Sequence, residues 1–356
     1  MSQDQRASHR MLWGLSPELC FLNHGSFGAT PRPILEEQSR LREHLERDPV
    51  YFLKRAALRL WDEAIERLSI FLNADAAGMV FVNNATTGVN TVLRNLDLHR
   101  GDEVLVTDST YQACRNAVDS LCERTGAQVR VAQIPIPLES PEDAIAAVMH
   151  AVTSATRVAL IDTIASPTGI RLPFEQLVDQ LQGVGVDVLL DAAHGPGAVP
   201  LNLSALNAAW VTGNCHKWLC TPKGSAFLHV REDKRALRPL VISHGATKPL
   251  GGRTRFRLEF DWMGTLDPTP WLCIPAALDL IGGLSTEGWP GVMARNRALA
   301  AEARQLITEA LGLQPVCTED SLGPMAAFII PGVPDPSGDE PLELRLFEEA
   351  QVQVPV

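Results

Sequence analysis

Between residues 79 and 191, short apolar runs alternate with stretches of helical periodicity, and this alternation restricts the fold more than any other feature of the sequence. The apolar runs lie at 79–82, 103–107, 128–133, 157–163 and 186–191, and helical patterns begin between them at Thr86, Tyr111, Pro141 and Pro173. Strands that alternate with helices form βαβ units around a mostly parallel sheet. The sequence therefore predicts an α/β fold.

The pattern changes after residue 191. The apolar runs 209–212 and 226–230 are separated by a turn-rich stretch with no room for a crossover helix, so at least one of them should run antiparallel to its neighbour. Two helices are predicted before the alternation, at 34–48 and 54–72. After it come helical patterns from Pro275, at 289–311 and at 341–350, together with apolar runs at 326–330 and 352–356 and a Pro/Gly-rich loop at 331–341.

These patterns divide the chain into three predicted parts. Residues 1–20 form an N-terminal arm, 21–265 a large domain with a mixed, mostly parallel sheet, and 266–356 a smaller α+β domain. The small domain is expected to be truncated, because no later segment follows the apolar run 352–356 to pair with it.

Composition limits the possible partners. The formal net charge of the 356 residues is -11 and no Lys/Arg run occurs, which disfavours a nucleic-acid-binding surface. No signal peptide and no apolar run of membrane-spanning length is present, so we expect no membrane association. Seven cysteines without a CxxC pair are typical of buried free thiols in a reducing compartment, which predicts a cytoplasmic protein, and we assign no metal site.

Polar residues that follow the apolar runs are the candidates for chemistry, because ligands of an open α/β sheet bind at the carboxyl ends of its strands. Thr86 and Thr87 open a helix directly after the run 79–82. Backbone N–H groups, the helix dipole and two hydroxyls make a phosphate site there, and an ordinary helix cap is the alternative interpretation.

Two further strand ends carry ionisable groups. Asp191 ends the apolar run 186–191 and is followed three residues later by His194. A carboxylate at the end of a buried strand needs a cation or a protonated nitrogen beside it, although an aspartate that caps the next turn is the alternative. Lys217 stands among His216, Trp218 and Cys215, where desolvation would lower the pKa of its amine and favour imine formation, with plain solvent exposure as the alternative. Gly264-Thr265, taken alone, indicates only a turn.

In this order the motifs resemble the class V aminotransferase superfamily, which consists of pyridoxal-phosphate enzymes of fold type I, the aspartate aminotransferase fold. The resemblance extends from residue 21 to about residue 284, and segments 21–31, 214–218 and 256–265 are most similar to the isopenicillin N epimerase-like branch.

The resemblance implies a role for each motif. Lys217 would form the imine with pyridoxal 5'-phosphate, Asp191 would pair with the ring nitrogen, and His194 would contact the ring oxygen. Asn23 and His24 would line the substrate side. Tyr111 would stack on the ring. The phosphate would be held by Thr86, Thr87 and His216, with Asn214 at a position where relatives often have serine. Thr265 would reach the phosphate of the neighbouring subunit's cofactor, which implies a homodimer with shared active sites.

Three departures from the family pattern bear on function. Leu266 stands where relatives often have arginine. Cys317, the one candidate for a desulfurase nucleophile, is expected to be buried. The arginine that usually binds the substrate carboxylate near the end of the small domain does not occur before Val356.

The resemblance implies an enzyme that acts at Cα or Cβ of an amino acid or peptide-like substrate. Epimerisation needs a second acid/base opposite Lys217, for which His24, Tyr51 and the cysteines are candidates. β-Elimination with C–S cleavage needs only Lys217, a cysteine desulfurase would need a reactive thiol, and transamination needs a second keto-acid substrate. An inactive pyridoxal-phosphate-fold binding protein is the non-enzyme alternative.

Overall fold

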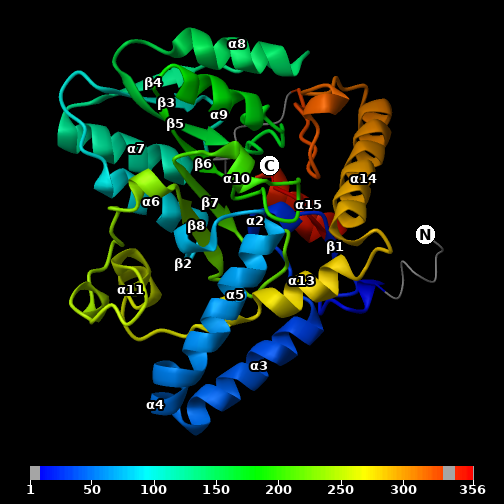
Figure 1. Ribbon diagram of the computed structural model, residues 1–356. Coiled ribbons are helices and arrows are strands. Elements are labelled where there is room, and N and C mark those ends of the chain that lie inside the picture. The colour runs from blue at the N-terminus through cyan, green and yellow to red at the C-terminus, as the bar shows by residue number, and fades with distance from the viewer. Residues whose placement is uncertain (1–8, 332–340, 356) are drawn as a thin grey trace.

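A seven-stranded sheet forms the centre of the molecule (Figure 1). The computed structural model describes residues 9–331 and 341–355. The strands follow the order β2-β8-β7-β6-β5-β3-β4. They comprise β2 (Met79–Val82), β3 (Glu103–Thr107), β4 (Gln128–Ala132), β5 (Thr156–Asp162), β6 (Asp187–Asp191), β7 (Trp210–Asn214) and β8 (Ala226–Val230).

Strand β8 is the antiparallel member of this sheet. It runs against both β2 and β7, whereas β7, β6, β5, β3 and β4 pair in parallel. The expectation of one reversed strand in this region is therefore confirmed, and so is the α/β class. Only β8 follows its neighbour β7 through a short connection, which leaves no room for a crossover helix.

Helices cover both faces of the sheet because successive strand residues point to opposite sides. Val80 and Val82 of β2 pack with α6 (Ala85–Asn95) and α7 (Gln112–Thr125), whereas Phe81 packs on the other face. That other face is covered by α5 (Ala57–Phe71), α8 (Pro141–Ala151), α9 (Phe174–Gly183) and α13 (Ile274–Gly282). The strands end between these two helix layers, and this position is where the ionisable motifs come together.

A segment near the start of the chain and one near its end form a second, two-stranded sheet. β1 (Cys20–Phe21) pairs in parallel with β9 (Val352–Gln353), with Cys20 opposite Val352. The last apolar run, for which the sequence offered no later partner, therefore does pair with a strand. Its partner precedes it in the sequence by more than three hundred residues, and only a folded chain reveals that pairing.

Other elements follow the sequence with local differences. α3 (Arg32–Arg47) is as predicted, while the second predicted helix begins with the short α4 (Pro49–Tyr51) and a π-helical turn at Phe52–Ala56. Residues 326–330 form no strand and contribute one bridge, between Pro315 and Phe328. The predicted loop 331–341 lies almost wholly outside the described residues.

The remaining helices lie mainly toward the C-terminus. They are α2 (His24–Phe27), α10 (Leu203–Leu206), α11 (Arg255–Asp261), α12 (Thr269–Leu272), α14 (Gly288–Leu311) and α15 (Leu342–Ala350). Within the described residues, no helix is long and apolar enough to cross a membrane.

Candidate active site

Lys217 lies just beyond the end of β7, and its side chain is buried. Its Nζ is 3.0 Å from His194 Nε2. Burial lowers the pKa of Lys217 to about 8, against the opposing effect of Asp191 and Asp162. The amine therefore has a larger neutral fraction at physiological pH than an exposed lysine, as imine chemistry requires.

Asp191 is the last residue of β6, and its carboxylate is almost completely buried. Oδ1 accepts a hydrogen bond of 2.8 Å from the N–H of Ala193, and Oδ2 accepts one of 3.2 Å from the thiol of Cys114. Burial raises the pKa of Asp191. A carboxylate held in this way gains from any cation or protonated nitrogen placed beside it.

A second buried carboxyl, Asp162, was missed by the sequence reasoning. It ends β5 and is the register partner of Asp191 in the adjacent strand. Burial and the neighbouring Asp191 raise the pKa of Asp162 well above its ordinary value, with Lys217 opposing. The signal that identified Asp191, an aspartate at the end of an apolar strand, also applied to Asp162. Cys114 carried no comparable signal, because its contact with Asp191 depends on how α7 packs on the sheet.

The start of α6, interpreted from the sequence either as a phosphate site or as an ordinary helix cap, has features of both. Asn84 caps the helix: its Oδ1 accepts from the N–H of Thr87 at 2.8 Å and from the Thr87 hydroxyl at 3.0 Å. Asn214 Oδ1 accepts from the N–H of Ala85 at 2.8 Å, which ties the end of β7 to this helix. Capping therefore occupies two of the N–H groups that the sequence assigned to phosphate, while the helix dipole and the partly exposed Thr86 remain.

His216 follows Asn214, the last residue of β7, by two residues. Its Nδ1 lies 3.0 Å from the carbonyl oxygen of Ser225 and donates to it, because a carbonyl can only accept. Burial lowers the pKa of His216 to about 4. The free Nε2 of this neutral ring is thus an acceptor until an anion nearby raises the proton affinity of the imidazole.

Of the two N-terminal residues named by the resemblance, His24 lies against Lys217. His24 Nε2 is 3.0 Å from the carbonyl oxygen of Lys217 and 3.7 Å from Cys220 Sγ. Gly28 makes this approach possible, because a Cβ there would lie 2.1 Å from the carbonyl oxygen of His216. Asn23 is less available, since its Oδ1 accepts from the N–H of Ser26 and caps α2.

Two predicted cofactor residues are exposed in the chain described here. Tyr111 stands at the N-terminus of α7 with 45 % of its surface exposed. Thr265 is also exposed. The structure brings Lys217 and His194 into contact and places Asp191 near enough to raise the pKa of Lys217. Within the described residues, no hydrogen bond joins Thr265 to any of the three.

The cysteines are buried, as predicted, with one exception. Cys20 is exposed, and the other six are buried. Cys317 donates a hydrogen bond of 3.5 Å to the carbonyl oxygen of Ser321, and burial raises the pKa of its thiol. It is not placed as a nucleophile.

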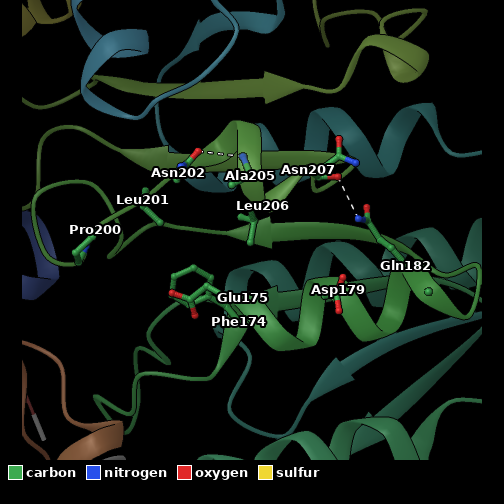
Figure 2. A pocket seen from close by; sticks show the side chains of 11 residues that line it. Phe174, Glu175, Asp179, Gln182, Pro200, Leu201, Asn202, Ala205, Leu206 and Asn207 are labelled. Atoms are coloured by element: carbon green, nitrogen blue, oxygen red, sulfur yellow. Dashed lines mark hydrogen bonds between the residues drawn. The ribbon is translucent and has the colours of Figure 1, made fainter.

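A surface cleft between α9 and α10 contains none of these residues (Figure 2). Two hydrogen bonds join residues of its lining: Asn202 Oδ1 accepts from the N–H of Ala205, and Gln182 Nε2 donates to the carbonyl oxygen of Asn207. We therefore assign the candidate site to the strand ends around Lys217.

Comparisons with known proteins identify the family of this chain. The family model Aminotransferase class-V matches residues 31–333. The chain is 34% identical over 365 residues to an isopenicillin N epimerase of Amycolatopsis lactamdurans, covering 98% of this chain and 90% of the relative. It is 27% identical to an L-cysteine desulfhydrase of Arabidopsis thaliana, covering 82% of this chain and 66% of that protein.

Among solved structures, a C-DES mutant with glycine covalently linked to the PLP cofactor has the same fold. Its TM-score is 0.80 at 22% identity, and the match covers 98% of this chain and 91% of that one. The family match spans most of the chain, and the epimerase relative exceeds 30% identity over nearly all of it. The protein therefore belongs to the aminotransferase class-V family and is a pyridoxal-phosphate-dependent enzyme.

Proposed function

We propose that the strand ends around Lys217 hold the pyridoxal phosphate of this enzyme. Lys217 would carry it covalently, Asp191 would face the ring nitrogen and His194 the ring oxygen. Tyr111 would stack on the ring, and the phosphate would lie against Thr86, Thr87, Asn214 and His216. The buried carboxylate of Asp191 supports this fit. Its two hydrogen-bond donors, a thiol and a backbone N–H, are both neutral, so a protonated ring nitrogen would supply the positive charge that a buried carboxylate needs.

When bound, pyridoxal phosphate supplies an electron sink that makes the Cα proton of an amino acid acidic. The protein must then hold and move that proton. Lys217 is suited to do so, because burial lowers its pKa to about 8, close to physiological pH.

The reaction that the geometry supports best is epimerisation at Cα of an amino acid or short peptide-like substrate. Inversion needs a second acid/base that serves the face of Cα opposite Lys217. We assign this role to His24, whose Nε2 lies 3.0 Å from the backbone carbonyl oxygen of Lys217. Because its Nε2 donates to that carbonyl, its Nδ1 is the nitrogen available to accept a proton. Burial lowers the pKa of His24, so the ring is neutral at pH 7 and acts as a base.

The other candidates for the second acid/base fit less well. Burial raises the pKa of Cys220 to about 12, which keeps its thiol protonated. Tyr51 lies on α4, at the opposite end of α3 from the loop that contacts Lys217 (Figure 1). His24 thus carries the epimerase proposal.

β-Elimination with C–S cleavage is the second candidate. The similarity to an L-cysteine desulfhydrase favours it, and Lys217 alone would serve as the base. Transamination would use the same residues with a second keto-acid substrate.

The test uses the holoenzyme in deuterated water with isopenicillin N and with L-cysteine as substrates. Inversion with deuterium at Cα, abolished in His24→Gln while exchange without inversion persists, is the result expected for the epimerase. Release of pyruvate, ammonia and sulfide from L-cysteine, retained in His24→Gln, would establish the lyase instead. Transfer of the amino group to a keto acid would point to the transaminase.

We further propose a cytoplasmic homodimer in which Thr265 reaches the phosphate site of the partner subunit, with a division between large and small domains near residue 265. The exposure of Thr265 supports a role outside its own chain. Dilution should then weaken cofactor retention, and Thr265→Val should release cofactor faster than the parent. A monomer that retains the cofactor fully would contradict the shared site.

A further inference from the structure

The carboxylate of Asp191 is held by one backbone donor and one thiol. The N–H of Ala193 donates to Oδ1 at 2.8 Å, and Cys114 Sγ lies 3.2 Å from Oδ2. Cys114 comes from α7, so the contact joins a covering helix to the carboxyl end of β6. Among the described residues, this thiol is the one side-chain donor to Asp191.

The direction of this hydrogen bond follows from the surroundings of Cys114. The side chain is 1% exposed, and both burial and the adjacent Asp191 raise the pKa of its thiol. The sulfur therefore keeps its proton at neutral pH. A carboxylate can only accept when ionised, so the thiol donates.

The other charged groups that face Asp191 are Asp162 and Lys217. Asp162 is the register partner of Asp191 on β5, is 3% exposed, and its Oδ2 has no hydrogen-bond partner among the described residues. The site thus contains two buried carboxyl groups and one lysine. Each group that stabilises the ionised form of Asp191 matters, because burial opposes that form.

We propose that Cys114 is a positioning residue that lowers the proton affinity of Asp191 and so keeps the shared proton on the nitrogen of the cofactor ring. This inference rests on the proposed role of Asp191 at that nitrogen. When a carboxylate and a ring nitrogen compete for one proton, the proton resides on the group of higher affinity. A donor to the carboxylate lowers the affinity of the carboxylate alone.

The test measures where that proton resides. The cofactor-free protein is loaded with pyridoxal phosphate labelled with ¹⁵N in the ring, and the ¹⁵N chemical shift reports the protonation of the nitrogen. Cys114→Ala should move the shift toward that of a neutral pyridine, and Cys114→Ser, which restores an O–H donor, should return it toward the parent value. Turnover of Cys114→Ala should fall about tenfold or more, the effect of losing a hydrogen bond to a charged group.

Cys122→Ser is the matched control, because Cys122 lies on the same helix, is buried, and in the described part of the chain makes no hydrogen bond to Asp191. It should leave the ¹⁵N shift unchanged. An unchanged shift in Cys114→Ala would overturn the proposal. Asp191→Asn separates this outcome from failure of the proposed function: if Asp191→Asn moves the shift and Cys114→Ala does not, only the positioning role is wrong, whereas no change in either variant removes Asp191 from the ring.

Discussion

The amine of Lys217 lies 3.0 Å from His194 Nε2, and the other ring nitrogen, His194 Nδ1, accepts a hydrogen bond of 3.4 Å from the indole N–H of Trp218. Burial holds the pKa of His194 well below its ordinary value, so the ring is neutral and carries one proton. Because Nδ1 accepts, that proton is on Nε2 and points to Lys217. This arrangement requires a neutral amine, and because burial lowers the pKa of Lys217 to about 8, that form predominates above this pH.

Trp218→Phe should therefore raise the pKa of Lys217. Without the indole donor, His194 can carry its proton on Nδ1 and accept from a charged lysine, which stabilises the ammonium form. Since the neutral amine is the nucleophile, the rate at which the cofactor-free parent reacts with a small aldehyde should rise through pH about 8, and the midpoint of the variant should be higher.

Trp210→Phe is the control, since Trp210 is also buried but its indole nitrogen has no hydrogen-bond partner among the described residues. It should leave the midpoint near 8. Equal midpoints in Trp218→Phe and the parent would show that the tautomer of His194 does not control the amine.

Lys217→Ala should bind pyridoxal phosphate without a covalent link. Reduction with borohydride followed by peptide mass spectrometry should label Lys217 in the parent and no lysine in the variant. Turnover should fall by at least about 10²–10⁴-fold, the contribution of a positioned acid/base. Lys223→Ala is the comparison, because burial also lowers the pKa of Lys223. Labelling of Lys223 in the parent would refute the assignment.

Asp191→Asn should retain the fold and lose activity. The amide preserves the size of the side chain and removes the charge that would keep the ring nitrogen protonated, so turnover should drop by orders of magnitude. The variant should also react with aldehydes at lower pH, because Asp191 raises the pKa of Lys217. Near-normal turnover with an intact circular dichroism spectrum would assign the role to another group.

The sequence predicted which residues lie at the strand ends better than it predicted the contacts that adjust the pKa values of those residues. Strand periodicity and the polar residue after each strand located Asp191 and Lys217, because both depend on local pattern. The bond between Cys114 and Asp191 depends on how α7 packs on the sheet, and the pairing of Cys20 with Val352 joins the two ends of the chain. Neither contact can be predicted from a local sequence pattern.

The same limit applies to the start of α6. Both sequence interpretations of this motif were reasonable, and the structure shows that Asn84 caps the helix while Asn214 takes a second N–H. Asn214 precedes Lys217 by three residues and lies far from α6 in the sequence. Its contact with Ala85 arises only because β7 ends beside that helix.

Gly88→Ala should weaken the phosphate site through packing. A Cβ at Gly88 would lie 2.0 Å from Thr212 Oγ1 on β7, so α6 must move away from the sheet. Such overpacking costs about 1–3 kcal/mol, and it shifts the helix start that we propose faces the phosphate. The thermal unfolding temperature should fall, and the dissociation constant for pyridoxal phosphate should rise.

Gly183→Ala serves as the control for this change, because a Cβ at Gly183 meets nothing within 4 Å. It should leave cofactor affinity unchanged. If Gly88→Ala binds pyridoxal phosphate as tightly as the parent, the helix start is not part of the phosphate site.

Cys317→Ser should leave catalysis within a few-fold of the parent. A desulfurase transfers sulfur to a cysteine thiolate that must be exposed and low in pKa. Cys317 is 4% exposed, donates to the carbonyl oxygen of Ser321, and has a pKa raised by burial. Turnover with L-cysteine, measured for the parent, for Cys317→Ser and for the exposed-thiol variant Cys20→Ser, should be similar in all three. A persulfide trapped on Cys317, together with loss of activity in Cys317→Ser, would instead establish a desulfurase. The buried Cys317 thiol would then have to become exposed during the reaction.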